Sequence, residues 1–387
     1  MHKHVIIIAG WHDYNMLMGF CRYAHEAGWT LNTVSIFQSA VPRRWQADGL
    51  LTTNVFRPDL RRFVRKAAAV MPAVLHGCDD LRLGIPRVEC DEAAIGRLAA
   101  EHLLDQGHKN FVFFSHSDAL HARRRLDGFR ARLRAAQRDC LVLSKISATS
   151  AGLADWLAGQ LKHLPKPVGL FAVDDLLASE AIEAALDGGW RVPEDMAVLG
   201  VGNNDLVCQY SQIPITSIGQ PMEQQAYAAA ALLDRLMHGR PAPKAPVVLP
   251  PSGLITRMST DHLAVTHPAV KRAVEFMMEH LVAGPLTSRQ IAQAIGISIT
   301  LLFRLFHREL ACTPSNLIQR FRIRRARDLM LTTSEKISAI SERCGFLNLR
   351  TFQRTFIRLE GLHPQAWRQA QREKFQTRFE PRLFTGG

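Results

Sequence analysis

Polar and aromatic side chains stand at the ends of predicted strands in the first two thirds of this 387-residue chain. Asp174 and Asp175 follow the apolar run VGLFAV, and Asn203 follows MAVLGVG. Carboxylates accept hydrogen bonds from vicinal hydroxyls, Arg donates them, and a Tyr or Trp ring packs against C–H groups. These residue types suit a hydroxyl-rich small molecule, bound beyond the carboxyl ends of the strands. The predicted ligand-binding residues are Tyr14, Trp45, Arg125, Asp174, Asp175 and Asn203.

Two of these residues also have a purely structural interpretation. Asp175 could cap a helix that begins near Leu176, and Trp45 could belong to the core. The sequence leaves both alternatives open.

Residues arranged for catalysis or for metal binding are not found in the sequence. The 16 histidines form no HExxH spacing, and the seven cysteines are scattered without a CxxC pair, as expected for reduced thiols in a cytoplasm. Gly200-Val201-Gly202 resembles the start of a dinucleotide fingerprint, but no third glycine follows. We therefore expect neither an enzyme nor a bound cofactor or metal.

Positive charge is concentrated in the last third of the chain. Residues 1–261 contain 28 Lys and Arg against 26 Asp and Glu, whereas residues 262–387 contain 20 against 9. This asymmetry indicates a polyanionic partner for the C-terminal part, although a solvated basic face would produce the same count. No apolar run approaches the roughly 20 residues that span a bilayer, so no membrane association is expected.

The same basic third contains an internal repeat. The stretch LLFRLFHREL at 301–310 aligns with TFQRTFIRLE at 351–360, so that Leu302 corresponds to Phe352 and Arg304 to Arg354. Apolar residues recur at every fourth position in both copies, which is typical of an amphipathic helix.

The first copy carries the signals of a helix, a tight turn and a second helix. Thr287 and Gln290 form a capping box, and Gly296 supplies the turn that ends the first helix. Ser298 then begins the second helix. These signals predict a helix-turn-helix unit at 287–310.

The second copy is predicted in the same way, at 334–360. Ser334 is expected to cap its first helix and Asn348 its second. A long helix that begins at Thr313-Pro314 and continues to about Leu331 should join the two units.

The exposed N-terminal half of the second helix in such a unit contacts base edges, while flanking positive groups bind phosphates. Arg can donate two hydrogen bonds to guanine and Gln can bond adenine in the same way. A phosphate contact or a solvated face is the alternative for each arginine. The predicted DNA-binding residues are Thr300, Phe303, Arg304, Arg350, Thr351, Gln353 and Arg354, with His307 and Leu349 beside them.

The first 261 residues alternate short apolar runs with amphipathic ones. HVIIIAG, GLLTTNV, PAVLHG, FVFFSH, VGLFAV and MAVLGVG are strand-like, and helix-like segments lie between them. Alternation of this kind predicts parallel sheets with helices on both faces, and 261 residues suffice for two lobes. The expected organisation is a two-lobed α/β sensor domain at 1–261 followed by an all-α domain at 262–387.

The C-terminal part resembles the AraC/XylS-type DNA-binding domains. The residues that carry the resemblance are Phe352, Arg354, Phe356, Gly361, Pro364, Trp367 and Arg368, together with Arg322, Ile323, Ala326, Leu329 and Met330 in the joining helix. This resemblance implies seven helices and two recognition helices that enter successive segments of the major groove. It also implies paired half-sites and hence a homodimer.

The N-terminal part resembles the effector domain of LacI/GalR-type repressors, which has a periplasmic-binding-protein-like fold. Matching pieces include Gly107-His108-Lys109, Arg125-x2-Gly128-Phe129 and Phe171-Ala172-Val173-Asp174-Asp175. The resemblance implies a sugar effector and favours Arg125 and Asp174 as its ligands. Where the family commonly has an Asp that bonds the sugar, this chain has Gly202, which puts xylose itself in doubt.

Together these features predict a cytoplasmic transcription regulator that binds a double-stranded DNA operator and a monosaccharide effector. RNA polymerase would be a further partner if it activates. The same architecture with a non-sugar metabolite, or with no ligand, is the alternative.

Overall fold

The chain forms two compact units, Met1–Ala264 (unit 1) and Val265–Gly387 (unit 2). The computed structural model describes residues 2–11, 13–33, 36, 41, 46–55, 57–78, 82–145, 150–265, 267–310 and 312–370. Trp45, a predicted ligand-binding residue, lies outside these ranges.

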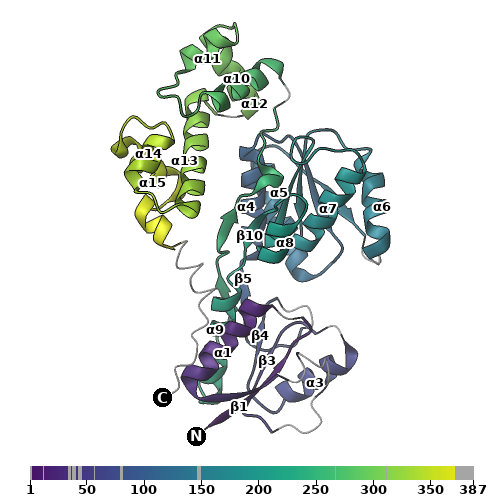
Figure 1. Cartoon of the computed structure of the whole chain (residues 1–387). Helices are drawn as coiled ribbons and strands as arrows, with labels where there is room; N and C mark the ends of the chain where they lie inside the picture. The colour runs from purple at the N-terminus through teal and green to yellow at the C-terminus, as the bar shows by residue number, and fades with distance from the viewer. Residues whose placement is uncertain are drawn as a thin grey trace. The chain divides into compact units, whose positions relative to one another are not determined.

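Lobe 1 of unit 1 is built on a six-stranded parallel sheet with the strand order β11-β5-β4-β3-β1-β2 (Figure 1). Its strands are β1 (Lys3–Ile8), β2 (Trp29–Asn32), β3 (Gly49–Thr52), β4 (Ala73–His76), β5 (Arg87–Cys90) and β11 (Val247–Leu249), and its helices are α1 (Tyr14–Ala27), α3 (Pro58–Ala68) and α9 (Met222–Met237). Alternate residues of β1 enter two cores: Val5 and Ile7 lie with residues of α1 and α9, and Ile6 and Ile8 lie with residues of α3. Helices therefore cover both faces of this sheet.

Lobe 2 repeats the plan with the order β12-β10-β9-β8-β6-β7, in which only the β10–β12 pair is antiparallel. Its strands are β6 (Asn110–Ser115), β7 (Leu141–Ser144), β8 (Val168–Ala172), β9 (Met196–Gly202), β10 (Thr216–Gly219) and β12 (Gly253–Ile255). Its helices are α4 (Glu92–Asp105), α5 (Leu120–Ala135), α6 (Ser150–Leu161), α7 (Asp175–Asp187) and α8 (Asp205–Tyr210), with the short 3-10 helix η1 (Met258–Thr260). The predicted fold class, two mainly parallel sheets with helices, is confirmed.

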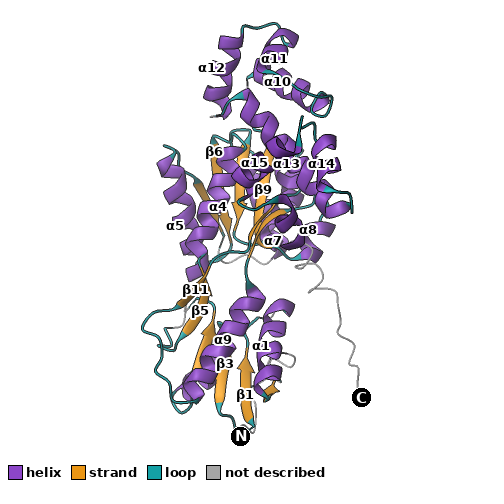
Figure 2. Cartoon of the chain, turned by 90° about the vertical axis from the view of Figure 1, so that its left-hand side faces the viewer, coloured by secondary structure: helices purple, strands orange, loops and turns teal. Residues whose placement is uncertain are grey.

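Three chain segments connect the lobes: β5 to α4, β10 to α9, and β11 to β12. Figure 2 shows the strands of the two sheets as separate groups, with β5 and β11 on the side of lobe 1 nearest lobe 2. At the crossings the Asp91 amide donates to the Leu249 carbonyl at 2.8 Å, and the Ser252 amide donates to the Gly219 carbonyl at 2.8 Å. The crossings are therefore bonded to one another.

Unit 2 is helical. Its helices are α10 (Pro268–Glu279), α11 (Ser288–Ala294), α12 (Ile299–Leu310), α13 (Pro314–Thr332), α14 (Ile337–Arg343), α15 (Leu349–Glu360) and a last helix at 364–370. Figure 1 shows α13 running from the α10–α12 group to the α14–α15 group. Residues of α13 share a core with Phe352, Phe356 and Trp367, the aromatic residues of the second repeat.

Local capping chemistry starts most of these helices as predicted. Thr287 and Gln290 form the capping box of α11. Ser298 accepts from the Leu301 amide at 3.2 Å, Thr313 from Asn316 at 3.2 Å, and Asn348 from Thr351 at 2.8 Å. The side chain of each cap satisfies an amide that the first turn of its helix leaves without a backbone partner.

The prediction that Ser334 caps α14 is wrong. The helix begins at Ile337, and the residue before it, Lys336, makes no side-chain cap hydrogen bond. Instead, Arg368 donates to the Glu335 carbonyl at 2.7 Å, and this bond holds the approach to α14. This bond satisfies a backbone acceptor, and the first turn of α14 has no side-chain cap.

Among the described residues, no single helix has both the length and the hydropathy of a membrane span. Only α11 and α12 taken together, bent by 98° at their junction, meet that criterion.

The close approach of α4 and α5 depends on two glycines, and this dependence can be tested. A Cβ on Gly128 would lie 2.0 Å from the Ala93 carbonyl oxygen, and one on Gly96 would lie 2.0 Å from the Arg125 carbonyl oxygen. We expect Gly128→Ala to lower the free energy of unfolding of unit 1 by about 1–3 kcal/mol, because the helices must separate. Urea unfolding monitored by tryptophan fluorescence measures this, since five of the six tryptophans lie in unit 1.

Gly159, in α6, is the control, because a Cβ there would meet nothing within 4 Å. Gly159→Ala should leave stability unchanged or raise it by up to about 1 kcal/mol. Equal effects of the two substitutions would contradict the packing argument.

A buried histidine in lobe 2 should make unit 1 sensitive to acid. His108 is 3% exposed, and neither ring nitrogen has a hydrogen-bond partner among the described residues. Burial lowers the pKa of His108 to about 3. In the unfolded chain this histidine binds a proton below about pH 6.5. Its contribution to stability is therefore fully present above that pH and is lost as the pH falls toward 3.

The expected loss from this one residue is about 1.4 kcal/mol per pH unit below pH 6.5. Urea unfolding between pH 7 and pH 5 should show a shallower pH dependence for His108→Gln than for the natural chain. His25→Gln, at an exposed position of α1, controls for the substitution itself. An unchanged slope in His108→Gln would show that His108 does not contribute.

Candidate ligand site and nucleic-acid interface

The paired aspartates after β8 have different roles. Asp174 is the N-cap of α7, and its Oδ1 accepts from the Leu177 amide at 2.8 Å. Asp175 is 3% exposed: its carboxylate accepts from the Ser217 hydroxyl at 2.6 Å and from the Asn204 amide at 2.8 Å. The cap that the sequence offered as an alternative for Asp175 is provided by Asp174.

The Asp175 carboxylate, just after β8, connects the residue Asn204 after β9 with Ser217 in β10. Burial raises the pKa of Asp175, and its hydrogen bonds oppose that rise. A Cβ on Gly200 would lie 2.4 Å from Asp175 Oδ1, and one on Gly202 would lie 3.2 Å from Oδ2. Gly202 also has φ +122°, a backbone conformation that residues with a side chain rarely adopt. The glycine at the family's usual Asp position thus gives space to the Asp175 carboxylate.

Asn203 is held by protein contacts on both sides. Its backbone N–H donates to the Ser217 hydroxyl at 3.0 Å, and its side-chain Oδ1 accepts from Arg257 Nη2 at 2.8 Å. Arg257 also donates to the Ile215 carbonyl at 2.8 Å. The side chain therefore lies at the predicted strand end and is already oriented by Arg257.

Arg125 is buried in an ion pair. It is 4% exposed; its Nε donates to Glu92 Oε2 at 2.6 Å and its Nη1 donates to the Val173 carbonyl. Glu92 is the first residue of α4, directly after the first crossing, and its other oxygen accepts from Gln220 at 3.3 Å on the second crossing. Arg125 thus connects α5 to the crossings and to the residue before Asp174.

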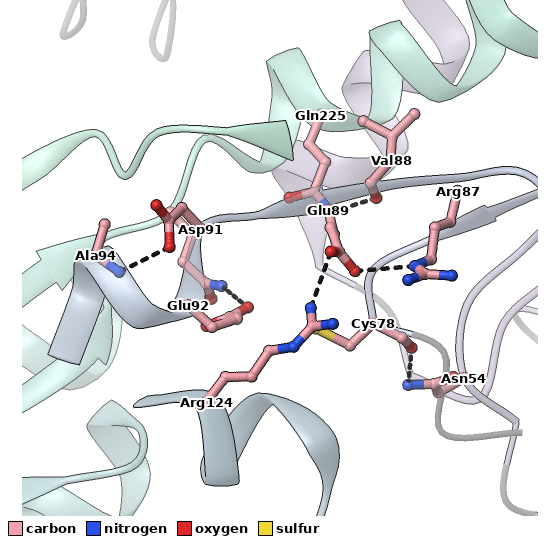
Figure 3. Close-up of polar contacts among 11 residues, drawn as sticks. Asn54, Cys78, Arg87, Val88, Glu89, Asp91, Glu92, Ala94, Arg124 and Gln225 are labelled. Carbon is pink, nitrogen blue, oxygen red and sulfur yellow. Dashed lines mark hydrogen bonds and ion pairs between the residues drawn. The ribbon is translucent and has the colours of Figure 1, made fainter. Parts of the chain in front are cut away.

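A second arginine bridges the two lobes (Figure 3). Arg124 Nη1 donates to Glu89 Oε1 at 2.8 Å and lies 3.8 Å from Cys78 Sγ. Figure 3 shows Glu89 between Arg124 and Arg87, whose Nε donates to Oε2 at 3.1 Å. Because Glu89 belongs to β5 of lobe 1 and Arg124 to α5 of lobe 2, this pair joins the lobes.

Aromatic and histidine side chains lie at the carboxyl ends of the lobe 1 strands. Tyr14 begins α1 after β1 and is 71% exposed, so its ring is available to a ligand. His76, the last residue of β4, is 1% exposed and packs near Trp11 and Phe20, with ring centroids 6.1 and 5.7 Å away. Burial lowers the pKa of His76 to about 4, which makes it a neutral imidazole near pH 7.

Sequence reasoning missed Glu89, Glu92, His76 and His121. Burial lowers the pKa of His121 to about 4, and Arg125 and His116 act in the same direction. No short motif marks these residues. Their positions could have identified them, because Glu89 and Glu92 flank the segment that crosses between the lobes and His76 ends an apolar run.

The recognition helix of the first repeat, α12, has one buried and one exposed face. Leu302, Leu305 and Phe306 are at most 5% exposed and form its buried face. Ile299, Thr300, Phe303, Arg304, His307 and Arg308 are exposed. The predicted residues Thr300, Phe303 and Arg304 therefore share the outer face.

The recognition helix of the second repeat, α15, has the same division. Phe352 and Phe356 are fully buried, and Leu349, Arg350 and Arg354 are exposed. Thr351 and Gln353 are partly exposed beside them. Within the described ranges no acidic group lies within ion-pair distance of Arg304, Arg350 or Arg354.

Other arginines of unit 2 are used within the protein. Arg322 is 9% exposed and donates to the Leu281 and Gly284 carbonyls, at 3.1 and 2.6 Å. Arg327 pairs with Glu360 at 3.4 Å, and Arg358 donates to Gln319 at 2.6 Å. The bend of 98° between α11 and α12 falls in the range of helix-turn-helix motifs.

A segment of each unit matches a known domain family. A periplasmic binding protein-like domain matches residues 100–260, and a helix-turn-helix domain matches residues 291–370. The xylose operon regulatory protein of Escherichia coli (strain K12) is 32% identical over 221 residues, 57% of this chain and 55% of that protein. The chain thus aligns with little more than half the length of this relative. The protein of the same name from Haemophilus influenzae is 26% identical over 73% of this chain and 74% of its own length.

Solved structures share the fold. The structure of xylose-binding transcription activator xylR has a TM-score of 0.59 and 24% identity, and the match covers 96% of this chain and 98% of that one. A transcriptional regulator CelR–cellobiose complex has a TM-score of 0.54 and 23% identity over 66% of this chain and 84% of that one. The chain therefore contains a segment that matches periplasmic binding protein-like domains and a segment that matches helix-turn-helix domains, and its sequence is similar to the xylose operon regulatory proteins.

Proposed function

We propose that the chain is a sequence-specific DNA-binding transcription regulator whose activity responds to a sugar bound in unit 1. The observation that carries the DNA-binding part is the pair of exposed recognition faces. Arg304 on α12 and Arg350 and Arg354 on α15 have no acidic partner among the described residues, whereas Arg322 and Arg327 are bonded within the protein. Unpaired guanidinium groups on the outer faces of two recognition helices suit phosphates and guanine edges.

The effector that the site supports is a neutral sugar. Arg124 and Arg125 at the lobe junction are each paired with a buried carboxylate, Glu89 and Glu92, and Glu89 also pairs with Arg87. Because these guanidinium groups are already bonded to carboxylates within the protein, they are less available to a sugar acid or a sugar phosphate than unpaired cations would be. The relatives are named for xylose, and solved neighbours were determined with cellobiose and with D-xylulofuranose, which are all uncharged.

The alternative effector, a non-sugar metabolite, has one observation in its favour. Both oxygens of Asp175 and the side-chain oxygen of Asn203 are used by protein donors. Fewer free acceptors remain at this strand end than a sugar usually engages. Calorimetry of the full chain against matched neutral sugars, sugar acids and amino acids separates the two effectors.

The remaining parts of the proposal concern assembly and location. The chain acts as a homodimer on paired half-sites of double-stranded DNA in the cytoplasm, and contacts RNA polymerase if it activates. It carries out no catalysis, in keeping with its relatives, which are regulators. Light scattering with and without DNA tests the dimer, and a strict monomer in both states would rule it out.

Asp174 is the ligand residue that can be tested most cleanly. Asp174→Asn removes the charge but keeps an oxygen to cap α7. We expect sugar affinity to fall by about 10- to 100-fold, because a hydrogen bond to a charged acceptor contributes about 1.5–3 kcal/mol. DNA affinity without sugar should not change. Isothermal calorimetry and DNA-binding assays measure the two quantities.

Asp187→Asn at the other, exposed end of α7 is the matched control and should bind sugar normally. If Asp174→Asn binds every sugar as the natural chain does, Asp174 is a helix cap alone.

DNA binding should depend steeply on salt. With about 6–8 phosphates neutralised, the logarithm of affinity against the logarithm of salt should have a slope of about −5 to −7. Arg304→Ala combined with Arg354→Ala should make the slope shallower by about 2, whereas Arg134→Ala, exposed on α5 of unit 1, should not. Fluorescence anisotropy with the full chain measures it, and a slope near zero would contradict the proposal.

A further inference from the structure

The exposed faces of the two recognition helices correspond residue by residue, at a separation of fifty positions. One line along α12 is formed by Ile299, Phe303 and His307, and the equivalent line along α15 is formed by Leu349, Gln353 and Ile357. A second, parallel line is formed by Thr300, Arg304 and Arg308, and its equivalent by Arg350, Arg354 and Arg358. The repeat thus gives two copies of one surface whose differences can be compared directly.

The central position of the first line differs in chemistry between the copies. It is Phe303 in the first unit and Gln353 in the second, whereas the neighbouring position is arginine in both, Arg304 and Arg354. The first unit therefore replaces a side chain with two hydrogen-bonding groups by an apolar ring.

Phe303 lies outside the buried face of α12. Leu302 and Phe306 are fully buried and fill the inner face of α12, while Phe303 is 40% exposed and Ile299, one turn earlier, is 42% exposed. The two lie one helical turn apart and form an apolar strip that is partly exposed to water. Burial of such a strip against a partner is favourable in proportion to its area.

The apolar group that B-DNA presents in its major groove is the C5-methyl of thymine. A recognition helix in that groove brings the residues of its N-terminal half to base edges. Phe303 and Ile299 lie in that half of α12, and Gln353 lies in the equivalent turn of α15, where a Gln side chain can pair with adenine.

We propose that Phe303, supported by Ile299, recognises a thymine methyl group in the major-groove segment bound by the first helix-turn-helix unit. Recognition of thymine by the first unit and of other bases by the second makes the two segments of each half-site unlike. This inference rests on the proposed function, because it needs the chain to bind duplex DNA.

The experiment starts from DNA that the full-length chain selects from a random duplex pool. Each thymine of the selected duplex is then replaced singly by deoxyuridine, which removes only the methyl group. At the thymine that Phe303 contacts, the replacement should weaken binding about fourfold, because that is the loss of affinity expected when one buried methyl group is removed. Phe303→Ala should bind the thymine and uracil duplexes equally, and Phe303→Gln should lose the same discrimination.

Met278→Ala is the matched control, because Met278 is a large apolar residue that is 53% exposed and belongs to α10, which is not a recognition helix. It should keep the thymine–uracil difference. Circular dichroism melting of each variant verifies folding, and the scan on the natural chain does not depend on any variant.

Two results would overturn the inference while leaving DNA binding intact. One is a natural chain that binds every uracil duplex as it binds thymine; the other is a Phe303→Ala variant that keeps the full difference. The second would point to Phe303 as a contact for another protein. If no duplex is enriched at all, the proposed function itself is wrong.

Discussion

Burial of a charged guanidinium is costly unless the group is paired and hydrogen-bonded, and in unit 1 this constraint acts where the two lobes join. Arg125 is accommodated at 4% exposure because Glu92 accepts its Nε–H at 2.6 Å. Glu92 can do so because it begins α4 immediately after the crossing from β5, and because Gly96 and Gly128 let α4 and α5 approach closely. Removal of either charge would leave the other unpaired in the interior, at a cost of several kcal/mol.

The same pairing determines which chemistry the junction can offer a ligand. Glu89 neutralises Arg124 across the lobes as Glu92 neutralises Arg125 within lobe 2. The arginines are therefore hydrogen-bond donors held in place by carboxylates, which suits hydroxyl groups. Unit 2 shows the opposite arrangement: its recognition arginines are exposed and without acidic partners in the described residues, so their charge is available to a polyanion.

The sequence predicted those parts of the fold that local chemistry determines. Long apolar runs such as MAVLGVG became β9, and the caps at Thr287, Thr313 and Asn348 start their helices. Strand β5, with the sequence RVEC, was missed because two charged residues interrupt it; one of them, Glu89, pairs with lobe 2. The sequence also could not show contacts between distant residues: Asp175 bonds Ser217, which is 42 residues away, and Arg368 bonds the Glu335 carbonyl before α14.

The central claim is that a sugar in unit 1 changes how unit 2 binds DNA, and thermodynamic linkage tests it most directly. The affinity of the full chain for its selected duplex is measured with and without saturating neutral sugar, and the affinity for that sugar with and without the duplex. The account predicts that both affinities change, and by the same factor, typically about 5- to 150-fold for such coupling. A sugar that binds tightly but leaves DNA affinity unchanged would contradict the account, because binding and regulation would then be independent.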